Sequence, residues 1–268
     1  MPRRKITPIC QTQTRQNNLT CVITHSQRSQ SALFFDSRTT PTIVHSILTL
    51  LDVYRTLDSI SLQRPPRTAS PLDFKLSVLF RRPMIDGEAY DLSVHKQLFG
   101  SRFSVDSATS TETALSGSYR YVDEQARRPK YIARVPGCDG MQIRQYQERY
   151  LAEFPNIQAE WIFWATCGLA LLRASRIPQA VLRRFTQPKR RSTEQSPRMV
   201  LLHHEIRCPA ALTEGEIGGL RTADQTTLRI AEPTVVIAGI KGLITTFSYE
   251  IADPAGRKMA YETSFRLG

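Results

Sequence analysis

The sequence predicts an α+β protein with one or more ferredoxin/RRM-like β-sheet cores and a helical insertion. Strand-like segments surround a single helix in the first 80 residues, residues 140–185 are helical, and the last 70 residues return to strand-like sequence. Strands that flank a helix in this order are typical of two-layer α+β folds. We expect three parts: an N-terminal unit (1–100), a loop and helical insertion (101–195), and a C-terminal β-rich part that completes the core (196–268).

The N-terminal elements follow from β-branched residues and from helical spacing. Residues 19–24 and 32–35 are rich in β-branched or aromatic residues, which favours strands. Between residues 41 and 54 the apolar side chains recur every three or four positions, which predicts an amphipathic helix. Thr39 or Thr40 can cap this helix, and Pro41 suits its first turn. Residues 74–80 alternate and predict a further strand.

The middle and the end of the chain differ in character. Residues 101–118 are rich in Ser, Thr, Gly and Asp and are expected to form a loop. Helices are expected over 142–154, 156–175 (capped by Asn156) and 179–185. Strands are expected over 199–206, 234–238 and 243–251, and residues 258–267 close a hairpin after the turn at 253–256.

Composition and charge point to a polyanionic partner. The 36 Lys and Arg residues exceed the 24 Asp and Glu residues, so the 268-residue chain carries a formal charge of +12. Such an excess favours binding to phosphates. The five cysteines are widely spaced, and we find no Cys-x-x-Cys pair, phosphate-binding Gly loop or paired-Asp metal motif. We therefore expect no cofactor and no metal site. The longest apolar run has 12 residues, so a cytoplasmic protein without a membrane partner is expected.

Several segments have both a functional and a structural interpretation. The basic cluster over 176–198 is either a solvated helix end or a grip for phosphates. The aromatic and basic residues between 119 and 131 either stack on unpaired bases or line the edge of a hairpin core. The segment 239–242 is a tight turn that also permits close approach of a phosphate backbone. In the His203-His204-Glu205 run one histidine is expected to pack inward, and the run is a poor metal site.

The basic composition, the N-terminal strand–helix–strand unit, the helical insertion and the C-terminal β region with its Gly-flanked basic turn together resemble the RAMP RNA-binding proteins of CRISPR systems. Among these the chain is similar to the guide-RNA-processing endoribonucleases, including those of type IV systems. Gly239 and Gly242 stand here for the longer glycine-rich loop of that superfamily.

This resemblance implies a metal-independent endoribonuclease that binds a CRISPR repeat hairpin and processes precursor guide RNA. The 2′-hydroxyl attacks the adjacent phosphodiester and leaves a 2′,3′-cyclic phosphate. Arg28 and Arg38 would stabilise the phosphorane, and His25 or His45 would carry the proton. The residues expected to bind RNA are Arg120, Arg127, Arg128, Lys130, Arg183, Arg184, Lys189, Arg190, Arg191 and Lys241.

Other subunits of a CRISPR ribonucleoprotein are further expected partners. The alternatives are a non-catalytic RNA-binding subunit of such a particle and a basic protein that packages nucleic acid. Both fit the same charge and aromatic content.

Overall fold

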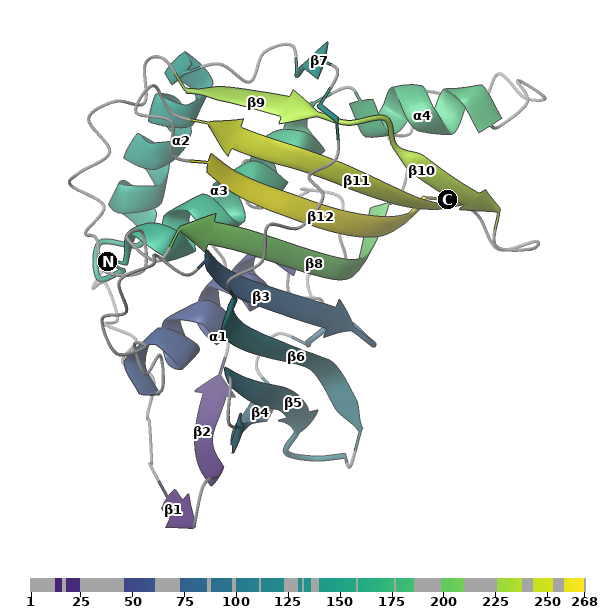
Figure 1. Cartoon of the computed structure of the whole chain (residues 1–268). Helices are drawn as coiled ribbons and strands as arrows, with labels where there is room; N and C mark the ends of the chain where they lie inside the picture. The colour runs from purple at the N-terminus through teal and green to yellow at the C-terminus, as the bar shows by residue number, and fades with distance from the viewer. Residues whose placement is uncertain are drawn as a thin grey trace, which may run out of the picture. The chain divides into compact units, whose positions relative to one another are not determined.

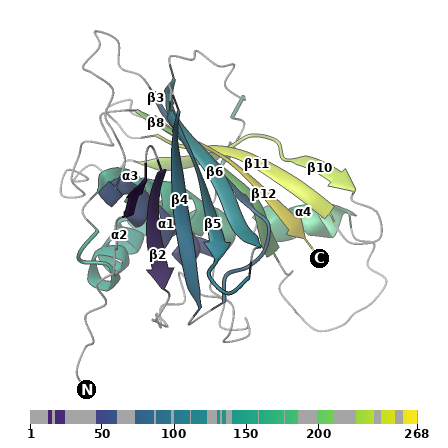
Figure 2. The same cartoon turned by 90° about the horizontal axis from the view of Figure 1, so that it is seen from below.

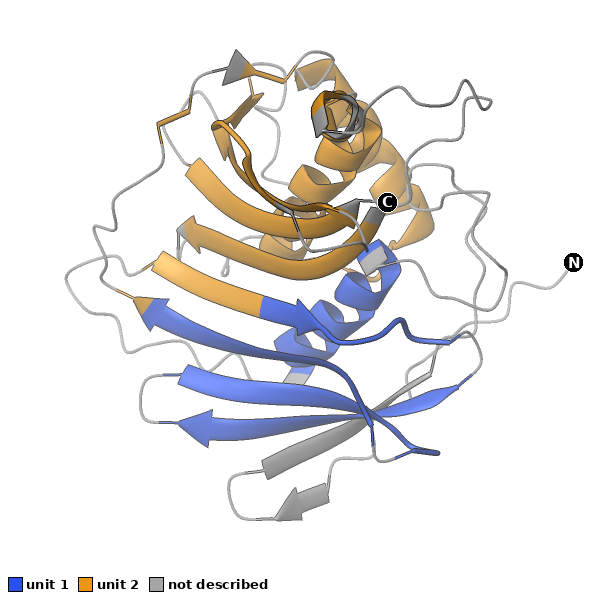
Figure 3. Ribbon diagram, turned by 90° about the vertical axis from the view of Figure 1, so that its right-hand side faces the viewer, with its two compact units in different colours: residues 1–68, 78–121 blue, residues 69–77, 122–268 orange. Residues whose placement is uncertain are grey.

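The computed structural model describes sixteen segments of the chain, and its contacts group the residues in two units. The described residues are 13–15, 18–24, 46–60, 73–85, 88–97, 100–110, 112–122, 130–131, 133–135, 140–157, 159–175, 177–185, 199–209, 226–237, 243–252 and 258–267. Unit 1 comprises residues 1–68 and 78–121, and unit 2 comprises residues 69–77 and 122–268. Strand β3 (Asp73–Phe80) contributes to both, as its change of colour in Figure 3 shows. The predicted division at residues 100 and 195 stays a prediction.

Unit 1 consists of an antiparallel sheet and one long helix. Its strands are β1 (Gln13–Arg15), β2 (Asn18–Thr24), β4 (Ala89–Gln97), β5 (Gly100–Ser107) and β6 (Thr113–Val122). They pair in the order β1-β2-β4-β5-β6-β3, and Figure 2 shows β2, β4, β5 and β6 side by side. Helix α1 (Ser46–Ile60) contacts β2 and is buried from Ile47 to Leu57 except at Asp52 and Arg55, which are partly exposed.

Unit 2 has a second antiparallel sheet and a helix buried beneath it. The strands are β7 (Ala133–Arg134), β8 (Met199–Pro209), β9 (Thr227–Ile230), β10 (Thr234–Ile237), β11 (Leu243–Ala252) and β12 (Lys258–Leu267). The order is β3-β8-β12-β11-β9-β7, and β10 also pairs with β11. The helices are α2 (Gly140–Glu153), α3 (Glu160–Ala174) and α4 (Ile177–Phe185).

Helix α3 forms the centre of unit 2. It contacts β12, α2 and α4, and Figure 1 shows it behind β11 and β12. Every residue from Glu160 to Leu172 is buried. A helix that is apolar on all sides must be enclosed on all sides, and here the sheet and the two other helices enclose it.

The fold class predicted from the sequence is therefore wrong. Residues 140–185 are not an insertion into a ferredoxin/RRM-like core, because α3 is itself the core of unit 2. The loop expected over 101–118 is also wrong, since β5 and most of β6 occupy it. Phe103 and Val105 point inward, and Arg102, Ser104 and Asp106 alternate with them. This alternation is a strand pattern that the polar composition concealed.

Several predicted elements are confirmed within the described residues. Strands β2, β3, β8, β10, β11 and β12 and helices α1, α2, α3 and α4 overlap the predicted ranges. The cap of α3 is Ala159 instead of the expected Asn156, so α3 begins later than predicted. The strand expected over 32–35 and the turn over 253–256 lie outside the described residues.

Candidate active site

A buried carboxylate at the start of α3 is the clearest candidate for chemistry. Glu160 lies in the first turn of the helix and is only 4% exposed. The indole Nε1–H of Trp164, one turn further along, donates to its Oε1 at 3.3 Å. The N-cap residue Ala159 contributes no side-chain hydrogen bond to the first turn. The position in the first turn also sets this carboxylate near the positive end of the helix dipole, which offsets part of the penalty that burial imposes on its charged form.

A second carboxylate and a thiol lie at the same end of unit 2. Burial, and then Asp73 and Glu160, raise the pKa of the Cys208 thiol far above its usual value. Both carboxylates are thus within electrostatic reach of Cys208. The Phe74 and Trp161 rings, next in sequence to the two acids, meet edge to face at 5.5 Å. The start of β3 and the start of α3 therefore lie next to each other, and we refer to Asp73, Glu160 and Cys208 as the acidic cluster of unit 2 because their charges influence one another.

Helix α3 is held to the sheet by polar contacts made within the core. The Tyr261 hydroxyl on β12 donates to the Trp164 carbonyl at 2.5 Å. The Tyr261 ring lies so close to Gly168 that a Cβ added there would meet it at 2.6 Å. These two contacts fix the position of α3 along β12, and with it the position of Glu160.

His204 on β8 is a second fixed contact of α3. Its Nε2 lies 3.1 Å from the Ala165 carbonyl, which can only accept, so Nε2 carries the proton. Its Nδ1 then accepts from the Thr263 hydroxyl at 3.0 Å, and Thr263 Oγ1 accepts from the Tyr249 hydroxyl at 2.9 Å. Burial lowers the pKa of His204 to about 4. The inward histidine expected from the sequence is confirmed, as a neutral structural residue.

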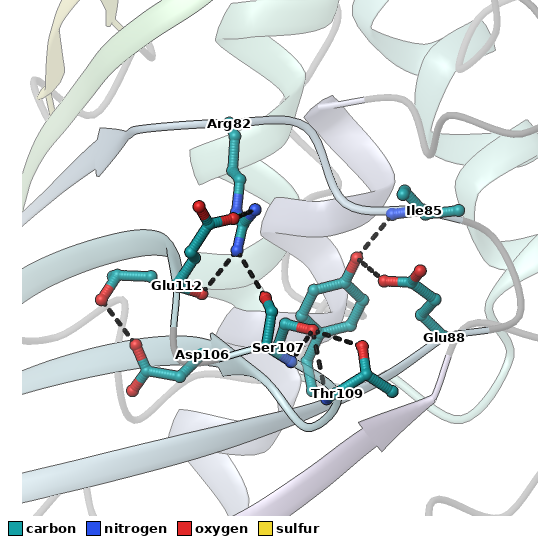
Figure 4. A network of polar contacts seen from close by, with 10 residues as sticks. Arg82, Ile85, Glu88, Asp106, Ser107, Thr109 and Glu112 are labelled. Atoms are coloured by element: carbon teal, nitrogen blue, oxygen red, sulfur yellow. Dashed lines mark hydrogen bonds and ion pairs between the residues drawn. The ribbon is translucent and has the colours of Figure 1, made fainter.

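Unit 1 contains a network of polar side-chain contacts (Figure 4). Arg82 is ion-paired with Glu112 and donates to Ser110, while Asp106 accepts from Thr113 at 2.6 Å and Ser104 at 2.9 Å. The Tyr90 hydroxyl donates to Glu88 and accepts from the Ile85 amide. A cavity of about 560 Å³ adjoins this network, lined by Arg81, Arg82, Ser104, Glu112, Thr113 and Ser116.

The acids of this network already accept from Arg82, Ser104, Thr113 or Tyr90. Burial raises the pKa of Tyr90, so its hydroxyl stays protonated. The Glu112 side chain of this network is 66% exposed, whereas Glu160 also accepts a hydrogen bond but is buried, so we take Glu160 as the stronger candidate. The sequence analysis did not single out Glu160, although an acid followed by twelve apolar or small residues marks the start of a buried helix.

The predicted catalytic residues lie outside the described residues, and so do most of the predicted RNA-binding residues. The first group is Arg28, Arg38, His25 and His45; the second is Arg127, Arg128, Lys189, Arg190, Arg191 and Lys241. Exposed side chains are found at Arg120 on β6, at Arg184 on α4, and at Lys130. Arg183 lies on α4 as well. Nothing in the structure tests the choice of these residues as a site.

Two further findings concern metals and membranes. In the part of the chain that the structure describes, no group of three or more His, Cys, Asp or Glu side chains is placed to hold a metal ion. Within the same residues, no helix combines the length and the apolar character that a membrane span requires.

Comparisons with known proteins connect this architecture with solved structures only. No protein-family model matches the chain, and no curated protein matches it either. The dehydratase domain from the CurK module of Curacin polyketide synthase aligns with a TM-score of 0.53 at 9% identity, over 97% of each chain. The dehydratase domain of PpsC from Mycobacterium tuberculosis, in complex with C12:1-CoA, aligns with a TM-score of 0.51 at 10% identity, over 96% of each. A trans-AT polyketide synthase dehydratase domain from Brevibacillus brevis aligns with a TM-score of 0.53 at 7% identity, again over 96% of each.

These neighbours overturn the resemblance to CRISPR RAMP proteins, and with it the predicted RNA cleavage, RNA binding and CRISPR partners. The basic charge that led to those predictions identifies no particular partner, because it is a property of the whole chain. The structures that match are dehydratase domains, and the fold that the chain shares with them is an antiparallel sheet wrapped around a helix. The chain therefore has the hot-dog fold, which it shares with these domains at identities of 7 to 10%.

Proposed function

We propose that this protein is an enzyme that acts on an acyl thioester and interconverts 3-hydroxyacyl and 2-enoyl thioesters. The observation that carries the proposal is the buried Glu160 carboxylate at the first turn of the helix that the sheet encloses. The likeness in fold to dehydratase domains supports it, one of which was solved with C12:1-CoA. The prediction that this protein is an enzyme is kept in this proposal, whereas the predicted endoribonuclease activity is not.

Dehydration of a 3-hydroxyacyl thioester requires the movement of one proton. A base removes a proton from C2, and the electron pair of that C–H bond becomes the C2–C3 double bond. The C3–O bond breaks, and the oxygen leaves as water after it takes up a proton. Glu160 receives the C2 proton as a carboxylate and returns it, as a carboxylic acid, to the departing oxygen. The carboxylate is then restored, and no other reactant is consumed.

The surroundings of Glu160 suit this role. The dipole of α3 and the Trp164 indole both favour the ionised carboxylate, which is the form that removes the C2 proton. Backbone amides in the first turn of a helix are also suited to stabilise negative charge on a thioester oxygen. Asp73 is the second carboxylate of the cluster, and the neutral Cys208 thiol adds no charge to it.

The test is turnover of CoA thioesters with purified full-length protein. We expect 3-hydroxyacyl-CoA to give the ultraviolet absorbance of a conjugated enoyl thioester, without release of free thiol. Glu160→Gln keeps the size and the acceptor oxygen, and should lower kcat by about 100-fold or more. Glu148→Gln removes the same charge from an exposed position on α2 and should leave the rate unchanged. Release of thiol would indicate hydrolysis instead, and a fully active Glu160→Gln variant would refute the proposal.

A further inference from the structure

Trp164 on the next turn of α3 donates a side-chain hydrogen bond to Glu160. The indole Nε1–H donates to Oε1 at 3.3 Å, and the two side chains are 5% and 4% exposed. We propose that Trp164 is the positioning residue of Glu160: its indole N–H orients the carboxylate and stabilises its ionised form. The consequence for catalysis rests on the proposed function, whereas the pairing itself does not.

The indole is held in place from several sides. The Tyr261 hydroxyl donates to the Trp164 carbonyl at 2.5 Å, which anchors this turn of α3 to β12. The Trp164 ring meets the Phe163 ring edge to face, with centroids 5.1 Å apart. Close contact of Tyr261 with Gly168 holds the next turn at the same strand. The donor is thus preorganised toward the carboxylate, and little ordering is required when a substrate binds.

An indole is well suited to this task because it donates and does not accept. A side-chain amide or hydroxyl can turn to accept from a protonated acid, and so stabilises both forms. An indole N–H can only donate, so it stabilises the ionised carboxylate and not the protonated acid. It also carries no charge of its own, so it does not attract a counter-ion into the core.

The charges around Glu160 oppose its ionisation, so a hydrogen-bond donor is needed to stabilise the carboxylate. Asp73 from β3 adds a negative charge at the same end of the core, and a like charge opposes ionisation of a second carboxylate. Cys208 from β8 stays a neutral thiol, because burial and the two acids raise its pKa. The Lys75 ammonium of β3 is engaged by Glu205 of β8 at 2.8 Å. The indole and the dipole of α3 therefore oppose the effect of Asp73.

A spectroscopic test measures this pairing without any activity. The chain has two tryptophans, so Trp161→Phe leaves Trp164 as the only indole. We expect Trp164 emission to change with pH as Glu160 takes up its proton, in addition to a step near pH 4 from His204, which contacts the neighbouring Ala165 carbonyl. Adding Glu160→Gln should remove the Glu160 step and leave that of His204, and adding Glu148→Gln should leave both unchanged. An unchanged curve in the Glu160→Gln protein would overturn the pairing.

A kinetic test measures its consequence. Trp164→Phe retains a buried ring and removes the donor. We expect kcat to fall about tenfold with KM within about twofold, and the acidic limb of the kcat profile to move up by about one pH unit. Trp164→Gln restores a donor and should recover part of the lost kcat and part of the shift in the acidic limb. Trp161→Phe should leave the acidic limb of the kcat profile where it is in the wild-type enzyme. A Trp164→Phe enzyme with wild-type kcat and pH profile would overturn the inference.

The two tests separate the inference from the proposed function. A wild-type protein that turns over no thioester, but whose Trp164 emission still depends on Glu160, refutes the function and supports the pairing. An active protein whose Trp164 emission ignores Glu160 refutes the pairing and leaves the function standing.

Discussion

Helices α1 and α3 have the same length, 15 residues each, yet the sequence around them gives them different surroundings. Helix α1 is buried from Ile47 to Leu57 except at Asp52 and Arg55, and it ends at the exposed Asp58 and Ser59, whereas α3 is buried without interruption from Glu160 to Leu172. The first turn of α1 contains no acid, and that of α3 contains Glu160. Both helices are largely enclosed, but the acids of α1, Asp52 and Asp58, stand where the helix meets water, whereas Glu160 of α3 is held away from it.

The largest expected effect comes from placing a charge on each helix. Leu169 on α3 is 0% exposed, so Leu169→Lys should cost about 4 kcal/mol or more of unfolding free energy and can prevent folding. Ser59 lies exposed in the last turn of α1, where a cation suits the helix dipole. Ser59→Lys should stay within about 0.5 kcal/mol. Urea denaturation measures both, and similar costs would contradict the comparison.

The pH dependence of stability tests the buried histidine that contacts α3. The pKa of His204 falls from its usual value near 6.5 to about 4 on folding, so the unfolded chain takes up a proton first as the pH falls. This contribution to stability is complete above about pH 6.5 and is lost between pH 6.5 and 4, by about 3 kcal/mol. Urea denaturation across this range should show a shallower dependence for His204→Gln. Equal slopes for the two proteins would count against a neutral His204.

The contact of Gly168 with Tyr261 predicts whether an alanine at position 168 raises or lowers the free energy of unfolding. In an exposed helix, Gly→Ala stabilises by about 0.5–1 kcal/mol. Here the new Cβ would meet the Tyr261 ring at 2.6 Å, so Gly168→Ala should destabilise by about 2 kcal/mol. Tyr261→Leu in the same chain should reduce the additional cost of the alanine. Thermal and urea unfolding measure the sign of this change in stability. A stabilised Gly168→Ala protein would show that Gly168 and the Tyr261 ring are not in close contact.

The smallest effect is expected at the ion pair between β3 and β8. Lys75 Nζ and Glu205 Oε1 are 2.8 Å apart, and their side chains are 22% and 23% exposed. Because water and salt screen such a pair, a double-mutant cycle with Lys75→Met and Glu205→Gln should give about 0.5–1 kcal/mol of coupling. The coupling should shrink in about 1 M salt. A coupling as large as the Gly168 effect would mean that this pair is buried like the core of α3.

Secondary structure could be predicted from the sequence where a period or a composition was clear. The three-to-four spacing in α1 and the β-branched residues of β2 and β11 required no tertiary information. Residues 101–118 were misjudged because Ser, Thr and Gly occupy the exposed positions of β5 and β6. The buried Phe103 and Val105 were too few to outweigh them.

The arrangement of the elements was harder to predict, and so was the candidate site. The apolar run after Glu160 fits an inserted helix as well as a core helix, and only the sheet around it decides between them. The function of Glu160 depends on Trp164, Asp73 and Cys208, and two of these come from distant strands. The basic charge, by contrast, was visible in the sequence and did not specify a partner.

The central claim is that Glu160 removes the C2 proton of a thioester. The most direct measurement is exchange of that proton with solvent deuterium, followed by NMR or mass spectrometry of a 3-hydroxyacyl-CoA incubated with the protein in D2O. Our account predicts exchange with the wild-type protein and Glu148→Gln, and exchange at least about 100-fold slower with Glu160→Gln. Exchange by Glu160→Gln at the wild-type rate would contradict it.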